Sequence, residues 1–387
     1  GGAWPPPTPT SSREFSALGY FLAKEVNART GRPVGIINAS WGGTPIESWI
    51  AEEYLQDFPR AIAQKKILED DGYRDRIKQL ESENYVHWNA VLWGSDPGLQ
   101  APVKWMDPSF DDSSWERVDI LDDSWKSRNG LPLVGSHWWR RDIYIPDSDA
   151  GKEATLRLGC IVDADSVWVN GTFVGNTTYQ YPPRIYKVPA GVLHAGKNNI
   201  TVRLISNGGR PEFVPEKPYK LIIGDNTYSL EGKWAHHMGA PMPKGPDMAF
   251  YCYTPVVLYN SMINPVINFP VNAAVWYQGE SNVDRRGEYP ALMKQLTSCW
   301  RDRSGSSDMP FYIVELANFL SDKDVAGRNA WAEMRKLQAK GCEEIEGATL
   351  VPNYDLGEWN DIHPLNKKTL AERIALLIFP DSAKARR

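Results

Sequence analysis

The sequence of 387 residues has no excess of basic residues and no apolar stretch of membrane-spanning length. Its 48 acidic residues outnumber its 43 lysines and arginines, and no basic block occurs, so nucleic acid and anionic membranes are not expected partners. No run of 18 apolar residues occurs, and we therefore expect no membrane-spanning helix. The opening GGAWPPPTPT lacks the basic and apolar regions of a signal peptide.

Cysteines are few and stand far apart, and none of their spacings is typical of a zinc site. We expect isolated thiols in or near packed cores at Cys160, Cys252, Cys299 and Cys342. The adjacent His236 and His237 have no cysteine or acidic partner at a ligating spacing, so no metal site is predicted. Aromatic residues are abundant, with 16 tryptophans and 17 tyrosines, which suits either carbohydrate stacking or a large aromatic core.

Two polar clusters each follow an apolar run, and they are the most informative feature of the sequence. The first is WYQGESN at residues 276–282, and the second is DIHP at residues 361–364. Apolar runs in a chain that alternates strands with helices indicate buried parallel strands, and ligands bind at the carboxyl ends of such strands. A Gly-Glu pair and an Asp-x-His pair at two such ends predict acid–base or nucleophilic chemistry in one crevice.

The first part of the chain predicts a helix, a strand and a glycine-rich turn. Residues 13–30 have helical periodicity, and Gly31 is a suitable C-terminal stop. Residues 34–38 form a short apolar run that predicts a strand. The Gly-Gly-Thr-Pro sequence that follows is typical of a turn that leads into a helix, with Thr44 as N-cap and Pro45 as the first helical residue.

Residues 95–236 have a different pattern, with frequent turn residues and apolar residues that alternate with period two. The clearest alternating runs are residues 155–159, 166–171 and 199–205. Asn170-Gly171 is a strong signal for a hairpin turn, and no long helical pattern interrupts this part. We predict an inserted antiparallel β-sandwich.

After residue 236, strands and helices alternate again. The predicted pairs are strand 272–278 with helix 287–301, strand 310–316 with helix 325–341, and strand 348–354 with helix 365–378. The sequence therefore predicts an α/β core formed by residues 1–94 and 237–387, with residues 95–236 as an inserted domain.

Four motifs in this order resemble the sialate O-acetylesterase branch of the SGNH hydrolases. They are GIINASWGGTPIESW, LYNSMINP, AAVWYQGESN and DLGEWNDIHPLNKKTLAERIAL. The insert resembles the jelly-roll found within these esterases, similar to the sugar-binding domain of some glycosidases, through HWWRRDIYIP, LRLGCIVDADSVWVNGTFVG and PPRIYKVPAGVLHAGKNNITVRL. The resemblance covers nearly the whole chain. It implies a flavodoxin-like three-layer α/β/α core with an inserted jelly-roll.

The sequence departs from the family at the nucleophile. In that family the nucleophilic serine lies in a GQSNM-like motif on the first strand, and this sequence has no such motif. Residues 15–20, FSALGY, resemble the helix that follows the missing block. We therefore expect the nucleophile upstream of residue 1, on a fragment of the same protein that would be a partner of this chain.

The resemblance implies roles for the polar residues near the C-terminus. His363 matches the general base, which takes the proton of the serine and later returns it to the leaving alcohol. Asp361 could orient the imidazole, although the more usual family spacing places the acid at the position of Asn360. Glu280 and Asp355 remain alternative acids, and so does a dyad without an acid.

The other half of the expected site stabilises the oxyanion. Gly42 and Gly43 match the block that provides a backbone N–H group, and Gln278 or Asn282 could donate a side-chain hydrogen bond. Ser281 lies in a Gly-x-Ser sequence and is an alternative nucleophile, but it aligns with a block that does not carry the serine of the family.

The resemblance implies a carbohydrate O-acetylesterase that acts on O-acetylated sialic acid or a related acetylated sugar through an acyl-enzyme. It implies no metal or cofactor, an O-acetylated carbohydrate as partner, and a periplasmic or secreted protein. A catalytically inactive carbohydrate-binding protein on an esterase fold is the alternative. A glycosidase would need two carboxylates that face across a groove, and only Glu280 stands out.

Overall fold

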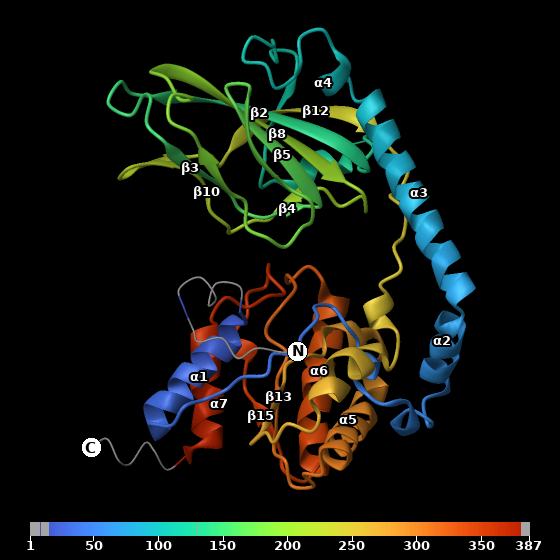
Figure 1. Cartoon of the computed structure of the whole chain (residues 1–387). Coiled ribbons are helices and arrows are strands. Elements are labelled where there is room, and N and C mark those ends of the chain that lie inside the picture. The colour runs from blue at the N-terminus through green and yellow to red at the C-terminus, as the bar shows by residue number, and fades with distance from the viewer. Residues whose placement is uncertain (1–7, 9–14, 129, 381–387) are drawn as a thin grey trace. The chain divides into compact units, whose positions relative to one another are not determined.

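The computed structural model describes residues 8, 15–128 and 130–380. Contacts divide the chain into an α/β unit, which is interrupted in sequence after Asp75 and resumes at Phe250, and a β unit, Arg76–Ala249 (Figure 1). The boundaries predicted after residues 94 and 236 fall inside helix α3 (Asp71–Ser95) and strand β12 (Lys233–Pro241). The contacts place the first boundary earlier, after Asp75, and the second later, after Ala249.

A parallel sheet of three strands forms the middle of the α/β unit. Its strands, in the order of the sheet, are β13 (Ala274–Trp276), β14 (Phe311–Val314) and β15 (Ala348–Val351). Phe311 is in register with Ala274 on one side and with Ala348 on the other. The three predicted strands are confirmed, although each is shorter than the apolar run that predicted it.

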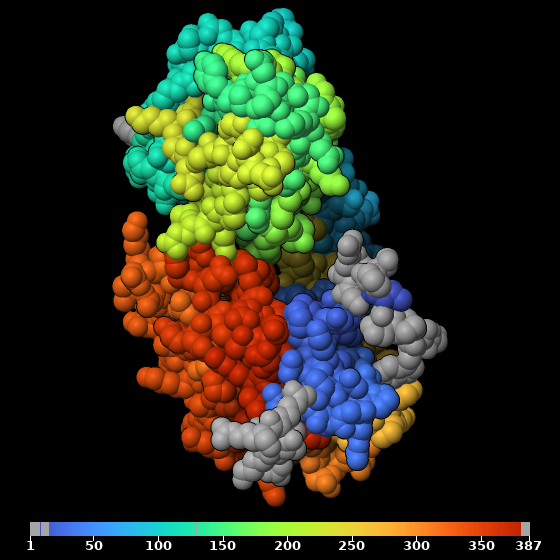
Figure 2. All heavy atoms as spheres, turned by 90° about the vertical axis from the view of Figure 1, so that its left-hand side faces the viewer, coloured from blue at the N-terminus to red at the C-terminus, as the bar shows by residue number. Residues whose placement is uncertain are grey.

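Helices cover both faces of this sheet. They are α5 (Tyr289–Ser304) and α6 (Val325–Glu344) on one face, and α1 (Ala17–Thr30) and α7 (Lys367–Ile378) on the other. Along β14, Phe311 and Ile313 face α5 and α6, whereas Tyr312 and Val314 face α1 and α7. Helices α1 and α7 lie side by side (Figures 1 and 2). The unit is therefore a three-layer α/β/α structure.

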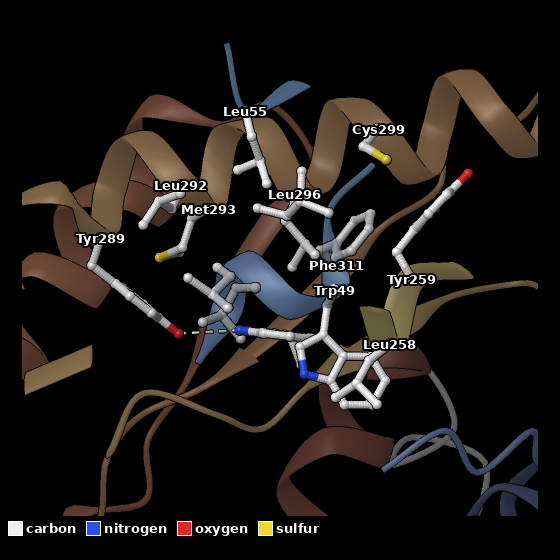
Figure 3. Packing of buried hydrophobic residues seen from close by; sticks show 14 of the residues in the cluster. Trp49, Leu55, Leu258, Tyr259, Tyr289, Leu292, Met293, Leu296, Cys299 and Phe311 are labelled. Atoms are coloured by element: carbon white, nitrogen blue, oxygen red, sulfur yellow. Dashed lines mark hydrogen bonds between the residues drawn. The ribbon is translucent and has the colours of Figure 1, made fainter. Parts of the chain in front are cut away.

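The larger core of the α/β unit lies between the sheet and α5. Leu292, Met293 and Leu296 of α5 are fully buried there. Figure 3 shows them near side chains from distant parts of the chain, including Trp49, Leu55, Leu258, Tyr259 and Phe311. Burial of each such side chain contributes about 1.5–3 kcal/mol, so this core joins the two sequence halves of the unit.

Helix α1 begins and ends at residues that satisfy its free backbone groups. The hydroxyl of Ser16 accepts a hydrogen bond of 3.1 Å from the N–H of Gly19. Gly31 adopts a left-handed φ of 70°, and its N–H donates to the carbonyl of Asn27. The predicted stop at Gly31 is confirmed. The predicted residues 13 and 14 lie outside the described residues, and the helix begins at Ala17 because Ser16 caps it.

The prediction of a strand at residues 34–38 is wrong. In the part of the chain that the structure describes, these residues form no strand. An apolar run becomes a strand only when its backbone N–H and C=O groups find a ladder partner. Among the described strands, β13 pairs with β14 alone, and residues 34–38 pair with none. Val34 packs against the core that α1 and α7 form with the sheet.

The turn that follows leads into a short 3₁₀-helix, η1 (Ile46–Trp49), in place of an α-helix. Pro45 occupies its N-cap position in an extended conformation, so the predicted capping by Thr44 is wrong. The Thr44 hydroxyl instead donates to the carbonyl of Trp41 at 2.8 Å and accepts from the indole of Trp49 at 3.0 Å. These two contacts use the hydroxyl that would have capped the helix.

The β unit is a sandwich of two antiparallel sheets. One has the order β1-β12-β2-β8-β5-β6 and the other β11-β10-β3-β7. Val167 and Val202 from the first sheet share a buried core with Leu156 and Leu221 from the second. The bounds are β1 (Glu116–Asp119), β2 (Gly135–Ile145), β3 (Ala154–Leu158), β5 (Ala164–Val169), β6 (Thr172–Thr177), β7 (Ile185–Val188), β8 (Gly196–Ser206), β10 (Tyr219–Ile223) and β11 (Asn226–Ser229).

The hairpin predicted at Asn170-Gly171 is confirmed. The two residues join β5 to β6, with φ values of 48° and 76°. Positive φ at both central residues is the geometry of the type I′ turn, for which Asn-Gly is the favoured pair.

Shorter elements complete the structure. They are strands β4 (Ile161–Val162) and β9 (Glu212–Phe213), α-helices α2 (Pro59–Glu69) and α4 (Pro97–Gln100), π-helix η5 (Tyr259–Ile263), and 3₁₀-helices η2 (Glu52–Tyr54), η3 (Asp123–Ser127), η4 (Tyr251–Tyr253), η6 (Asn264–Val266), η7 (Glu280–Glu288) and η8 (Tyr354–Leu356). Of the helices in the described residues, none is both long enough and apolar enough to cross a membrane.

Candidate functional site

The predicted site residues lie on the loops that leave the carboxyl ends of the sheet. Gln278 and Glu280 follow β13, and His363 lies between β15 and α7. Parallel strands place their carboxyl ends at one edge, which is where open α/β sheets bind ligands.

Gln278 connects the end of β13 to the glycine-rich turn. Its Nε2 atom donates to the carbonyl of Thr44 at 3.0 Å and to Oδ1 of Asn282 at 2.8 Å. Its Oε1 atom accepts from the hydroxyl of Tyr289 at 2.9 Å. Both N–H groups of this amide are therefore engaged within the protein, where they brace the turn.

The amide of Asn282 is also engaged, and its side chain is buried. Its Oδ1 atom accepts from the backbone N–H of Ile46 at 3.0 Å, and its Nδ2 atom donates to Glu47 at 2.9 Å. Glu47 is itself buried and ion-paired with Arg285. These contacts use both N–H groups of Gln278 and one N–H group of Asn282 within the protein, and the expected contact of either amide with the substrate stays a prediction.

Gly43 lies in a turn that only glycine fits easily. Its φ is +74°, and a Cβ atom there would lie 2.3 Å from the hydroxyl oxygen of Tyr253. The carbonyl of Gly43 accepts a 2.5 Å hydrogen bond from the hydroxyl of Ser281, which joins the turn to the loop after β13. The backbone N–H groups of Gly42 and Gly43 stay the expected oxyanion donors, and among the described residues neither donates a hydrogen bond to a backbone carbonyl.

Asp361 and His363 form a local pair. The Asp361 carboxylate accepts the backbone N–H of His363 at 2.9 Å, and the same oxygen lies 3.8 Å from Nδ1 of the ring. Partial desolvation lowers the pKa of His363, and the Lys367 ammonium lowers it further, whereas Asp361 raises it. The balance favours a neutral imidazole, the form that can accept a proton.

Glu280 and Lys367 bring two further charges to this edge. Burial raises the pKa of Glu280, and the N–H groups of Glu280 and Gly279, together with Lys367, oppose that shift. Burial lowers the pKa of Lys367, and Glu280 and Asp361 oppose that shift in turn. The two carboxylates thus favour the charged form of Lys367, and burial opposes it.

Lys367 and Tyr277 are site residues that sequence reasoning missed. The ammonium of Lys367 donates to the hydroxyl oxygen of Tyr277 at 3.0 Å, and Nδ2 of Asn353 lies 3.4 Å from the same oxygen. Burial raises the pKa of Tyr277 to about 12, so its phenol is neutral. The signal that could have found Lys367 is its position in the first turn of the predicted helix 365–378, just after the DIHP motif.

Asp355, the other alternative acid, is engaged elsewhere. Its two carboxylate oxygens accept hydrogen bonds of 2.7 and 2.6 Å from the guanidinium of Arg373. This bidentate pair lowers the pKa of the Asp355 carboxyl. Within the described residues, no three His, Cys, Asp or Glu side chains converge as they would around a metal ion.

Comparisons with known proteins give two family matches. Residues 247–374 match the family described as carbohydrate esterase, sialic acid-specific acetylesterase, and residues 101–210 match the second all-beta domain of beta-galactosidase. The sialate O-acetylesterase of Mus musculus is 29% identical over 137 residues, which are 31% of this chain and 25% of that protein. The enzyme of Homo sapiens is 29% identical over 135 residues, 31% of this chain and 26% of that protein. The matched region is thus about a quarter of the length of these relatives.

Matches among solved structures include a carbohydrate acetylesterase from Xanthomonas citri. It has 18% identity and a TM-score of 0.31, and the match covers 62% of this chain and 75% of that one. A beta-glucuronidase from Faecalibacterium prausnitzii matches 26% of this chain and 18% of its own, at 19% identity and a TM-score of 0.23.

Proposed function

We propose that this chain, which resembles the sialate O-acetylesterase family in sequence over residues 247–374, acts as a carbohydrate O-acetylesterase. Its substrate would be O-acetylated sialic acid or a related acetylated sugar. The α/β unit would be the SGNH-hydrolase core, and the β unit the inserted jelly-roll. A parallel sheet between two helical layers and a separate β-sandwich support this assignment.

The observation that carries the proposal is the pair formed by Asp361 and His363 at the carboxyl edge of the sheet. The carboxylate lies 3.8 Å from Nδ1 of the ring, and the surroundings favour the neutral imidazole. A carboxylate beside a neutral imidazole is the combination of groups that a serine hydrolase uses to activate its nucleophile.

In this mechanism His363 takes the proton of a serine hydroxyl while the serine oxygen attacks the acetyl carbonyl carbon. Backbone N–H groups at Gly42 and Gly43 would stabilise the oxyanion. When the tetrahedral intermediate collapses, the bond to the sugar oxygen breaks and His363 returns the proton to that oxygen. Water then attacks the acetyl carbon while His363 takes its proton; the bond to the serine oxygen breaks, His363 returns the proton to that oxygen, and acetate leaves. The serine would come from the family's GQSNM-like block, a motif absent from this sequence, on an upstream fragment of the same protein.

A catalytically inactive carbohydrate-binding protein is the second candidate. One observation favours it: residues 101–210 match the second all-beta domain of beta-galactosidase. By resemblance to exported glycan esterases, we also propose a periplasmic or secreted location.

The test is hydrolysis of an aryl acetate and of O-acetylated sialic acid by the protein produced together with its upstream block. We expect His363→Ala to lower turnover by about 10³-fold or more, because the catalytic groups act as a unit. The matched control is His87→Ala, which removes an exposed histidine of α3. Near-normal turnover by His363→Ala would overturn the esterase mechanism. Sugar binding without turnover by the wild type would favour the second candidate.

A further inference from the structure

A pocket of about 260 Å³ lies in the α/β unit, at the end of α5 that is remote from the candidate site. Acidic residues of η2, residues between Val256 and Asn264, and Arg303 line it. Helix α5 begins at Tyr289, whose hydroxyl donates to the carbonyl of Gln278 at 2.8 Å. Arg303 lies in the last turn of α5, about 20 Å from Tyr289 at 1.5 Å per residue. The pocket is therefore separate from the carboxyl edge of the sheet.

Tyr259 brings an unsatisfied polar group to this pocket. The residue is 4% exposed, and its hydroxyl is buried without a hydrogen-bond partner among the described residues. Figure 3 shows its phenol extending away from the other labelled core side chains, with the hydroxyl at the outer end. Buried hydroxyls are nearly always hydrogen-bonded, because an unmet one costs stability. A molecule in the pocket that bonds this hydroxyl would remove that cost.

The backbone that carries this tyrosine is unusual in two ways. Tyr259 begins η5, a π-helix, which is a rare form and frequent at functional sites. Val256, just before it, has a φ of 74°, which a β-branched residue seldom adopts. The N–H of Val256 donates to the carbonyl of Glu47 at 2.9 Å, and its carbonyl accepts from the N–H of Asn260 at 3.0 Å. Rare backbone conformations that neighbouring contacts maintain are typical of ligand sites.

The charges of the pocket disfavour an anion. Two carboxylates line it, and one guanidinium does. Glu52 is ion-paired with Lys65 at 3.0 Å, and Glu53 is ion-paired with Arg303. An anionic molecule would therefore meet more negative than positive lining charge, and the one lining cation is already paired. A neutral molecule avoids this repulsion.

The rest of the lining suits a molecule with several hydroxyl groups. Asn260 and Asn264 are exposed, and their amides can each donate and accept hydrogen bonds, as the hydroxyl of Tyr259 can. Ala51 and Val256 add apolar surface. A sugar ring has this combination of hydroxyl groups and apolar C–H surface. Pockets for drug-sized ligands span about 300–1,000 Å³, so the smaller volume here favours a single sugar ring.

We propose that this pocket is a second binding site, for one neutral sugar ring, in which Tyr259, Asn260 and Asn264 bond the sugar hydroxyls. The inference does not depend on His363 or on ester hydrolysis. It gives a role to the LYNSMINP motif at residues 258–265, to which the esterase mechanism assigns none.

The experiment follows binding at the pocket by NMR of protein with ¹³C-labelled valine methyl groups. The signal of Val256 is assigned by its absence in Val256→Ala. The probes are the methyl glycosides of glucose, galactose and mannose, each paired with the uronide of the same ring, which carries a carboxylate. We expect a saturable shift of the Val256 signal with at least one neutral glycoside. The matched uronide should bind about tenfold more weakly, because its charge faces the two carboxylates.

Tyr259→Phe removes the hydroxyl alone. Since that hydroxyl has no partner among the described residues, the thermal midpoint should stay within about 1 °C of the wild type. The dissociation constant of the sugar should nevertheless rise about threefold to tenfold, and Asn264→Ala should have a similar effect. The matched control is Tyr54→Phe on the neighbouring η2, which removes a hydroxyl that donates to Asp302 at 2.8 Å. It should leave sugar binding unchanged, as should His363→Ala.

The absence of a saturable Val256 shift with every neutral glycoside would overturn the proposal and leave a pocket that holds water only. Unchanged affinity in both Tyr259→Phe and Asn264→Ala, or equal affinity for the matched uronide, would also overturn it. A shift that disappears in His363→Ala would assign the sugar to the candidate site instead. Binding with the expected variant pattern, in a protein without esterase activity, would reject the proposed function and retain this pocket.

Discussion

The side chain of Gln278 and the carbonyl oxygen of Thr44 are joined by a 3.0 Å hydrogen bond across 234 positions of sequence. The same amide donates to Asn282 and accepts from Tyr289, so it links the turn, η7 and α5. The two halves of the interrupted α/β unit are thus connected by partly buried polar contacts as well as by the apolar core.

The first prediction concerns this link. Gln278→Met keeps the size of the side chain but leaves the carbonyl of Thr44 and the Oδ1 of Asn282 without that donor. We expect the free energy of unfolding of the α/β unit to fall by about 1–3 kcal/mol, the usual cost of unsatisfied buried polar groups. Urea unfolding followed by amide hydrogen exchange measures it. The control is Gln56→Met, at an exposed position, which should change the free energy of unfolding by less than about 0.5 kcal/mol. An equal loss of stability in Gln56→Met and Gln278→Met would contradict the structural role of the Gln278 hydrogen bonds.

The second prediction uses two adjacent glycines as a matched pair. Gly43 has a φ of +74°, and a Cβ there would lie 2.3 Å from the oxygen of Tyr253, whereas a Cβ at Gly42 would meet no atom within 4 Å. Gly43→Ala should therefore cost about 1 kcal/mol or more in stability and disturb the expected oxyanion donor. Gly42→Ala should be tolerated. Thermal unfolding and aryl-acetate turnover of the two variants measure these effects. A Gly43→Ala variant as stable and as active as Gly42→Ala would refute the prediction.

The third prediction concerns pH and the β unit. His137 and His236 are buried there, with Nδ1 of the first 3.2 Å from Nε2 of the second. Burial lowers the pKa of His137 to about 4, and burial, together with the charge of His137, lowers that of His236 to about 2. The unfolded chain takes up these protons near pH 6.5 and the folded unit does not. Stability from this pair is therefore fully present above about pH 6.5 and falls as the pH is lowered toward 4.

For the two histidines together, the expected loss is about 2–3 kcal/mol between pH 7 and pH 5.5. Urea midpoints of the β unit across this range measure it. Replacement of both His137 and His236 by glutamine should flatten the slope over that range. His237→Gln, at the neighbouring exposed position, should retain the slope. An identical slope in the double variant would show that other groups govern the acid sensitivity.

Much of the α/β layout could be predicted from sequence because it depends on local pattern. The apolar runs that contain β13, β14 and β15, with the amphipathic stretches after them, identified three strand–helix pairs. Gly31 identified the end of α1. Residues 34–38 show the limit of this reasoning. Their apolar pattern is that of a strand, but a strand also needs a neighbouring strand for its backbone hydrogen bonds. The sequence of the run does not show whether such a neighbour is present.

The candidate site was less predictable, for a related reason. The motifs identified Glu280, Asp361 and His363 as the polar residues at the strand ends. They could not show that Gln278 donates to the carbonyl of Thr44 and Asn282 to the carboxylate of Glu47, each more than 230 positions away. Residue type and spacing indicate which chemistry is available, whereas long-range hydrogen bonds decide which groups remain free for it.

The last prediction addresses the acid that orients the base. Three carboxylates were candidates from the sequence, and the structure distinguishes their surroundings. Asp361 lies 3.8 Å from Nδ1 of His363. Glu280 interacts with Lys367, and Asp355 is held by Arg373 through two hydrogen bonds.

If Asp361 is the orienting acid, Asp361→Asn should lower kcat by between about 10-fold and 10⁴-fold, because the imidazolium that forms during the reaction loses its counter-charge. It should also lower the pKa of His363, since the carboxylate raises it in the wild type. Asp355→Asn is the matched control and should leave both quantities near their wild-type values, at the cost only of an ion pair on the surface. Glu280→Gln tests whether Glu280, and not Asp361, is the orienting acid. A loss of kcat in Glu280→Gln larger than in Asp361→Asn, with the titration of His363 unchanged in Asp361→Asn, would move the role of the acid to Glu280.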